Sequence, residues 1–138
     1  MGLTPRMPAR CPCGSGVPYA ECCGALHRGR AVGQPTAPTA ERLMRSRFSA
    51  FAVGDADYLL ATWHPSTRPR SLDLDPAMEW RRLEIRDTAA GGDHDTEGTV
   101  EFVAHYWDAT SSQLGLLQEH SAFVRERGQW FYVAPIDA

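Results

Sequence analysis

All four cysteines of this 138-residue chain lie between positions 11 and 23, in the stretch CPCGSGVPYAECCG. They form a Cys11-Pro-Cys13 pair and an adjacent Cys22-Cys23 pair, set among glycine, serine and proline. So short a segment has no apolar core of its own, and segments of this kind normally need a metal ion or a crosslink to fold. The cysteine cluster is therefore the strongest constraint on how the beginning of the chain folds.

Zinc is the interpretation that suits this cluster best. Four thiolates complete the tetrahedral shell of a structural zinc ion, and zinc binding contributes about 10–16 kcal/mol to the folding of zinc-finger peptides. A disulfide framework and four free thiols are weaker alternatives. His27 could take the place of one cysteine as a ligand. A closed shell leaves no position for a substrate, so we expect the metal to be structural.

The N-terminal stretch and the hydropathy of the chain predict a cytoplasmic protein. The N-terminal stretch MGLTPRMPAR lacks the apolar core of a secretion signal, and no apolar run is long enough to span a membrane. We therefore expect reduced thiols and no membrane-spanning segment. All 14 basic residues are arginine, with no lysine or asparagine anywhere, which indicates a GC-rich bacterial genome.

The charge is unevenly distributed. The net charge is −3, but residues 1–30 carry four arginines against a single acid, so the remainder is clearly acidic. An acidic body does not favour the phosphate backbone of a nucleic acid, and we expect no nucleic-acid partner.

Composition divides the chain into three parts. Residues 29–39, GRAVGQPTAPT, are rich in glycine, proline, alanine and threonine and are predicted to be a linker. The linker would separate a small cysteine-bearing head, residues 1–28, from a body formed by residues 40–138.

The first half of the body is predicted to be helical. A helix over residues 39–54 would begin at Thr39 as its cap and end at Gly54, with a buried stripe at Met44, Phe48 and Phe51. A second helix is predicted over residues 55–65, and a short third one over residues 75–80, where an aspartate precedes a proline.

The second half changes to a period of two, which is typical of strands. Strands are predicted over residues 81–89, 98–108, 113–126 and 130–135, with a tight turn before the last. Helices followed by a meander give an α+β domain, in which the helices pack on one face of a curved antiparallel sheet.

The cysteine stretch resembles the SEC-C motif, a zinc-binding motif found at the C-terminus of the secretion ATPase SecA and in many smaller proteins. The resemblance implies that Cys11, Cys13, Cys22 and Cys23 are all metal ligands. One departure is Val17-Pro18, where SEC-C segments often carry lysine, and this weakens any inference to anionic partners.

The resemblance extends into the body. The stretches LMRSRFSAF, DADYLLATWHPS and FVRERGQWFYV are similar to those of the YchJ-like family of bacterial proteins. That resemblance implies a body with the cone fold of nuclear transport factor 2, with a cavity between the concave face of the sheet and the helices. Cone-fold domains often form homodimers through the sheet, so a homodimer is a further expectation.

Glu119 is the main candidate for that cavity. Leu117, Glu119, Ser121 and Phe123 share one face of a predicted strand, so Glu119 points inward if its apolar neighbours do. A buried carboxylate needs a partner or a proton, and Arg47, on the flank of the first helix's apolar stripe, is the predicted partner. A shift of register by one residue would bring Gln118 and His120 inward instead.

Each of these residues has a structural and a functional interpretation. Glu119 is either half of a structural ion pair with Arg47 or a general acid or base, and we favour the ion pair. His64, at a predicted helix end, is either a cap for helix carbonyls or a catalytic base, and we favour the cap. Tyr106 and Ser121 complete the candidates for a ligand pocket.

Two functions compete. The favoured hypothesis is an adaptor whose zinc-stabilised head docks to a protein; in SecA the motif contacts the chaperone SecB and the ribosome, so the resemblance implies a partner in the translation or secretion machinery. The alternative is a small-molecule enzyme or ligand-binding protein, with a small hydrophobic ligand in the cone around Glu119. The sequence shows no complete catalytic constellation, which favours a protein without enzymatic activity.

Overall fold

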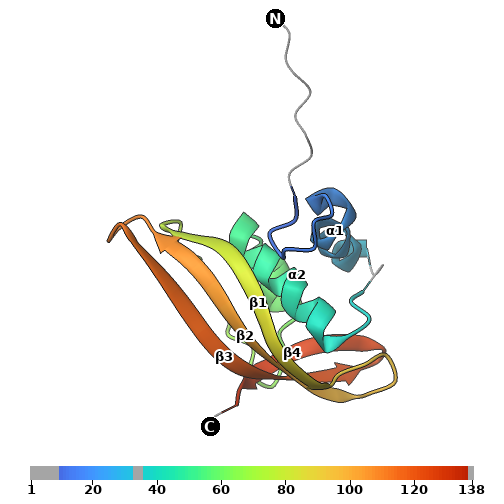
Figure 1. Ribbon diagram of the computed structural model, residues 1–138. Helices are drawn as coiled ribbons and strands as arrows, with labels where there is room; N and C mark the ends of the chain where they lie inside the picture. The colour runs from blue at the N-terminus through green and yellow to red at the C-terminus, as the bar shows by residue number, and fades with distance from the viewer. Residues whose placement is uncertain (1–9, 33–35, 137–138) are drawn as a thin grey trace, which may run out of the picture.

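The computed structural model describes residues 10–32 and 36–136 (Figure 1). A short 3-10 helix, η1 (Tyr19–Glu21), is followed by three α-helices and then by four strands. The strands form one antiparallel sheet in the order β1-β2-β3-β4, so the expected α+β architecture is confirmed. The elements are α1 (Cys23–Val32), α2 (Ala40–Val53), α3 (Ala56–Ala61), β1 (Met78–Ala90), β2 (Glu97–Asp108), β3 (Gln113–Glu126) and β4 (Gln129–Pro135).

Helix α2 has the ends that its sequence predicts. The Thr39 side chain accepts a hydrogen bond from the Arg42 backbone N–H at 3.1 Å, and Gly54 follows the helix in the left-handed conformation, with φ at 78°. Met44 and Phe48 are buried as predicted, whereas Phe51 is half-buried.

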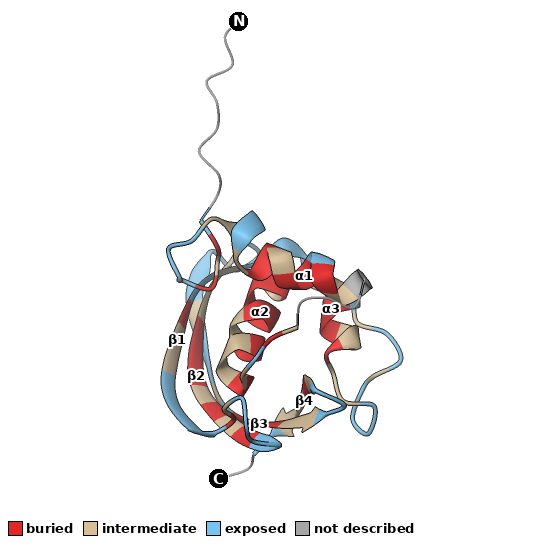
Figure 2. Cartoon of the chain, turned by 90° about the vertical axis from the view of Figure 1, so that its right-hand side faces the viewer, coloured by how far each residue is buried: buried red, intermediate tan, exposed pale blue. Residues whose placement is uncertain are grey.

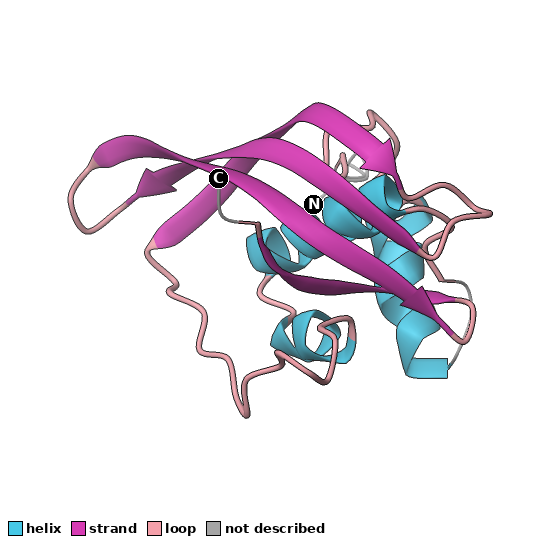
Figure 3. Ribbon diagram, turned by 90° about the horizontal axis from the view of Figure 1, so that it is seen from below, coloured by secondary structure: helices cyan, strands magenta, loops and turns pink. Residues whose placement is uncertain are grey.

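The helices lie on one side of the curved sheet, and α2 packs into its concave face (Figures 1 and 3). The buried positions of α2 form the centre of the molecule in Figure 2. The core between α2 and the sheet includes Leu43, Phe48, Val100, Phe102, Phe123 and Trp130.

The second predicted helix ends earlier than expected. Helix α3 stops at Ala61, and the chain then pairs with the edge of β4. The Tyr132 backbone N–H donates to the Thr62 carbonyl at 2.8 Å, and the His64 N–H donates to the Tyr132 carbonyl at 2.7 Å. Since these backbone groups bond to a strand, they are not available to continue the helix.

The predicted short helix over residues 75–80 is wrong. The Asp75 side chain accepts from the Ala77 backbone N–H at 2.9 Å, which makes a turn, and β1 begins at Met78. Trp80 pairs with Tyr106 of β2, so sheet pairing overrides the helix-start signal that Asp75 and the following proline provide.

The predicted linker does not separate two bodies. Residues 29–32 form the end of α1 rather than part of a linker, while residues 33–35 lie outside the described part of the chain, as do residues 1–9 of the predicted head. The head packs directly on α2, where the His27 ring nitrogen Nε2 lies 2.8 Å from the Ser46 carbonyl and Arg45 donates to the Cys13 carbonyl at 2.9 Å. None of the described helices has the length and apolar character needed to cross a membrane.

Candidate functional site

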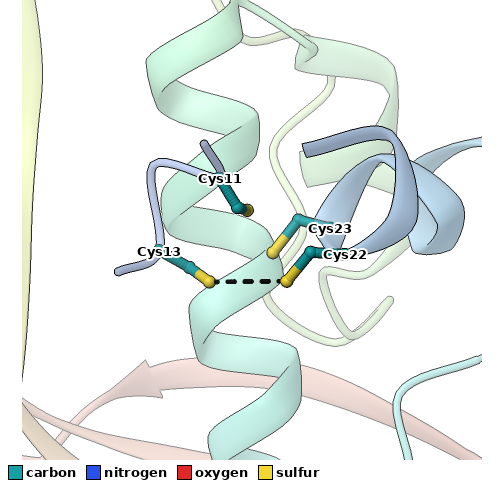
Figure 4. Close-up of side chains that lie close together, drawn as sticks. All are labelled: Cys11, Cys13, Cys22 and Cys23. Carbon is teal, nitrogen blue, oxygen red and sulfur yellow. Dashed lines mark hydrogen bonds between the residues drawn. The ribbon is translucent and has the colours of Figure 1, made fainter. Parts of the chain in front are cut away.

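The four cysteines converge from two segments (Figure 4). Cys11 and Cys13 lie on the loop before η1, while Cys22 and Cys23 stand where α1 begins. A hydrogen bond from the Cys11 backbone N–H to the Val17 carbonyl, at 2.9 Å, closes the loop. Gly14 and Gly16 turn it with φ values of 87° and 83°, which other residues adopt only with strain.

The sulfur atoms have the spacing of a metal centre. All four Sγ atoms lie within 4.8 Å of one another, and those of Cys13 and Cys22 are 3.7 Å apart. A tetrahedral ion with metal–sulfur bonds of about 2.3 Å requires sulfurs about 3.8 Å apart. Cys11, Cys13 and Cys23 are buried, Cys22 is half-buried, and no disulfide joins any of them. The four cysteines therefore could bind a metal ion.

Mutual contacts and burial shift the ionisation of these thiols. Contact with Cys23, supported by hydrogen bonds from Ser15, lowers the pKa of Cys13 to about 4. The same contact raises the pKa of Cys23, together with burial, and burial also raises the pKa of Cys22. Cys13 ionises readily while Cys22 and Cys23 resist ionisation, and a bound cation would supply the positive charge needed to ionise them.

Helix α2 holds the cluster from one side. Arg42 donates to Cys23 Sγ at 3.1 Å and to Cys22 Sγ at 3.4 Å. Ser49 Oγ lies 3.3 Å from Cys11 Sγ. Together with Arg45, which donates to the Cys13 carbonyl, these residues form a polar row on α2 with helical spacing. This row was not predicted from the sequence, although residues spaced three and four apart share one face of a helix.

His27 does not join the cysteines. Its ring nitrogens lie 2.6 Å from the Tyr19 hydroxyl and 2.8 Å from the Ser46 carbonyl, so both positions are already occupied. The ring packs on Tyr58 with a centroid distance of 4.4 Å, and burial lowers the pKa of His27. His27 joins α1 to α2 and α3, and the alternative ligand set that includes it is wrong.

A second candidate site is a cavity of about 190 Å³ between α2 and the sheet. Its wall is almost entirely apolar and aromatic, with Arg47 and Glu119 as its charged members. The full lining comprises Met44, Arg47, Phe48, Phe51, Trp63, Trp80, Phe102, Ala104, Leu117, Glu119 and Tyr132.

Glu119 faces this cavity, as the first of the two predicted registers requires. Ser121 and Phe123, on the same face of β3, are buried, whereas Gln118 and His120 are exposed. The Oε2 atom of Glu119 accepts hydrogen bonds from the Ser121 hydroxyl at 2.6 Å and from the Tyr132 hydroxyl at 3.2 Å. Ser121 therefore does not line the cavity itself; its hydroxyl holds the Glu119 carboxylate in place.

The predicted ion pair between Arg47 and Glu119 is wrong. Among the described residues, no ion pair includes Arg47, whose Nη1 atom donates to the Leu59 carbonyl and to Thr62 Oγ1, both at 2.8 Å. The carbonyl lies near the C-terminal end of α3, where the helix dipole favours a cation. Burial lowers the pKa of Arg47 to about 10, so it stays charged at neutral pH.

Two other predicted candidates lie outside the cavity. The His64 ring contacts Ser66 Oγ at 2.7 Å and Glu126 Oε2 at 3.0 Å, so it caps no helix carbonyl and does not reach the cavity. Tyr106 packs on Trp80 with a centroid distance of 5.1 Å and supports the wall without lining it. A side chain at Gly115 would overlap the Tyr106 ring, so this glycine allows the tyrosine to lie across β3.

The aromatic lining was not predicted residue by residue. Trp63 and Tyr132 meet through a backbone bridge between the segment after α3 and β4, and their rings pack edge to face at 5.2 Å. Trp80 was predicted to lie in a short helix. Pairing between segments far apart in the sequence places these three side chains, and local patterns carry no signal for it.

Known families match both parts of the chain, the cysteine-bearing segment and the body. Residues 39–135 match the family described as YchJ, middle NTF2-like domain, and residues 7–25 match the SEC-C motif. A UPF0225 protein of Streptomyces coelicolor is 54% identical over 122 residues, covering 88% of this chain and 90% of the relative. One of Corynebacterium glutamicum is 50% identical over 126 residues, covering 91% of this chain and 95% of the relative.

Two solved structures have the same fold. The solution structure of a SEC-C motif containing protein from Rhodopseudomonas palustris has a TM-score of 0.76 at 29% identity, covering 94% of this chain and 99% of that one. The crystal structure of a SEC-C motif containing protein from Psychrobacter arcticus has a TM-score of 0.74 at 26% identity, covering 93% of this chain and 82% of that one. The arrangement of helices and curved sheet is therefore shared across both parts of the chain.

The row on α2 leads to a prediction for Arg42. Replacing it in Arg42→Gln removes two hydrogen bonds to cysteine sulfurs, and bonds that involve a charged group contribute about 1.5–3 kcal/mol. We expect the free energy of unfolding, measured by urea denaturation, to fall by about that amount. Arg86→Gln is the matched control, because its exposed ion pair with Glu84 should contribute less than about 1 kcal/mol. Equal effects of the two substitutions would contradict a supporting role for Arg42.

Proposed function

This chain belongs to the YchJ-like family of UPF0225 proteins, with a SEC-C motif before an NTF2-like domain, and we propose that it is a binding protein for a small, largely apolar molecule. In this proposal the cavity of the cone holds the ligand. A structural zinc ion fixes the cysteine-bearing head to α2 and so to the wall of the cavity.

The cavity is the observation that carries the proposal. A direct ion pair between Arg47 and Glu119 would have favoured a purely structural role. The two residues instead line the space between α2 and β3 and bond to other partners. An apolar cavity of about 150 Å³ binds benzene in an engineered protein. The cavity of about 190 Å³ therefore has room for a somewhat larger molecule.

Binding explains the state of Glu119 better than general acid or base catalysis does. Two donors, the hydroxyls of Ser121 and Tyr132, hold one oxygen of its carboxylate. These donors fix the orientation of the carboxylate, which suits recognition of a ligand.

Zinc is the proposed metal because the donor set consists of four thiolates. Soft sulfur ligands in tetrahedral array are typical of structural zinc, and Cys11, Cys13, Cys22 and Cys23 would fill every coordination position. When bound, the ion would stabilise the fold. Arg42 places a positive charge beside the thiolates and offsets the negative charge of the site.

The metal proposal predicts how many zinc ions each chain carries and how the melting temperature changes when the metal is removed. Protein purified without added metal should carry one zinc ion per chain in native mass spectrometry. Because the head packs on α2, removing the ion with a chelator should lower the melting temperature of the whole chain, and Cys13→Ser should do the same without chelator. Adding zinc back should restore the wild-type protein but not the variant. A chain that carries no zinc, or that melts unchanged after chelation, would refute a structural zinc ion.

The cavity proposal predicts binding of a neutral apolar probe. Fluorobenzene, followed by fluorine NMR, should bind saturably to the wild-type protein. Ala104→Leu adds bulk to the cavity wall and should weaken this binding by about tenfold or more, since overpacking a cavity costs about 1–3 kcal/mol. Ala122→Leu makes the same change next to the inward-facing Ser121 and Phe123, on the other face of β3, and should leave binding unchanged. Absence of any saturable binding to the wild-type protein would refute the proposed function.

An adaptor role remains the second candidate, supported by the β2–β3 hairpin. Its tip projects beyond the helices (Figure 1) and exposes Leu114 and Leu116 by 74% and 61%. Exposed apolar side chains of this kind mark protein-binding surfaces when they gather in a patch.

The partner class of this second candidate, the translation or secretion machinery, rests on the SEC-C resemblance. Purified ribosomes should then bind the wild-type protein in co-sedimentation and bind a double variant, Leu114→Ser with Leu116→Ser, more weakly. Arg86→Gln serves again as the surface control. Equal co-sedimentation of the wild type and the double variant would exclude this surface.

A further inference from the structure

Two opposite charges face the cavity without touching each other. Tyr132 stands between them: the Arg47 guanidinium carbon lies 4.6 Å from the centroid of its ring, and its hydroxyl donates to Glu119 at 3.2 Å. Arg47 is only 3% exposed. A buried charge is stable only when hydrogen bonds and an opposite charge compensate for its lost hydration. The compensation between these two groups acts across a phenol ring rather than through direct contact.

Both charged groups keep unused hydrogen-bonding capacity. All the hydrogen bonds that Arg47 donates within the described residues leave from Nη1, so Nη2 and Nε have no acceptor there. Both hydrogen bonds that Glu119 accepts there end on Oε2, so Oε1 has no donor. An arginine offers five N–H donors in a planar fork that matches a carboxylate. The cavity thus presents a carboxylate-binding group and an ammonium-binding group on either side of Tyr132.

Trp63 adds a third unsatisfied group. It lines the same cavity, and its indole Nε1 is a fully enclosed donor that has no hydrogen-bond partner among the described residues. Its ring also lies 5.2 Å from the Arg47 guanidinium carbon. Buried donors are nearly always satisfied in folded proteins, so the wall of the cavity beside Arg47 carries a donor that the described residues do not satisfy.

Charge balance disfavours a ligand that carries a single charge. A monoanion bound at Arg47 would leave the cavity with the uncompensated charge of Glu119, and a monocation at Glu119 would leave that of Arg47. Either state places a net charge in apolar surroundings, which is costly. A zwitterion satisfies both groups and keeps the cavity neutral. Its ammonium would also lie beside aromatic rings, which attract cations.

We infer that the cavity binds a free α-amino acid with a small apolar side chain, its carboxylate at Arg47 and its ammonium at Glu119. This inference rests on the proposed function and names its ligand class. Met44, Phe48 and Phe102 offer an apolar wall for the side chain. Since about 150 Å³ holds benzene, a volume of about 190 Å³ suits an aliphatic side chain of the size of leucine rather than that of tryptophan.

The test compares leucine with analogues that each lack one charge. Isocaproate lacks the ammonium, isopentylamine lacks the carboxylate, and isopentanol carries no charge. Titration calorimetry on the full-length, zinc-loaded protein should show leucine binding at least about tenfold more tightly than either singly charged analogue. Equal or tighter binding of isocaproate or isopentylamine would overturn the inference.

Two variants test which side chain binds each charged group of the amino acid. Glu119→Gln keeps the shape of the side chain and should weaken leucine about tenfold while leaving isocaproate as tight or tighter. Arg47→Lys keeps the positive charge needed at the end of α3 but loses the planar fork, and should weaken leucine and isocaproate together. Glu126→Gln, on the same strand but outside the cavity, is the control and should change neither affinity. If Glu119→Gln weakens leucine and isocaproate equally, the ammonium is not at Glu119 and the inference falls.

The outcomes separate this inference from the proposed function. If fluorobenzene or isopentanol binds in the cavity and leucine does not, the amino-acid inference is overturned while the binding protein stands. If neither the neutral probes nor leucine binds, both are overturned.

Discussion

The packing of α2 between the cysteine cluster and the sheet is the contact on which the other parts of the molecule depend. One side of the helix presents Arg42 and Ser49 to the cysteine sulfurs, and another presents Arg47 and Phe48 to the cavity. A small head without an apolar core is thereby joined to a body that has one. Because a single helix borders both sites, whatever orders the cysteines also orders one wall of the cavity.

Helical spacing and local capping made part of this arrangement predictable. Thr39 and Gly54 mark the ends of α2 by local hydrogen bonding and backbone conformation, and alternation along residues 98–108 and 113–126 fixes the inner face of the sheet. The spacing of the cysteines also indicated their convergence. These features depend on neighbours within a few residues along the chain, which a sequence shows directly.

Contacts between distant segments were less predictable. Residues 75–80 carry a helix-start signal, but pairing of Trp80 with Tyr106 places them in β1. Arg47 was expected to pair with Glu119, yet the carbonyl of Leu59 is its acceptor, because α3 ends beside α2. Composition suggested a linker up to residue 39, although α1 continues to Val32 once it has α2 to pack on. In each case the competing partner comes from elsewhere in the fold.

Two arginines of α2, one at each site, lie in different surroundings. Arg42 lies beside two of the thiols, where its positive charge would offset the negative charge of thiolates bound to a metal ion. Arg47, five residues later, lies against two aromatic rings and donates to the Leu59 carbonyl and the Thr62 hydroxyl, with no acid in direct contact. Buried arginine is costly without an acid, and a site that only needed stability would gain by an apolar residue there. Arg47 on α2 and Glu119 on β3, which both line an apolar cavity and are held apart by Tyr132, form the arrangement expected of a cavity that recognises a ligand with both charges.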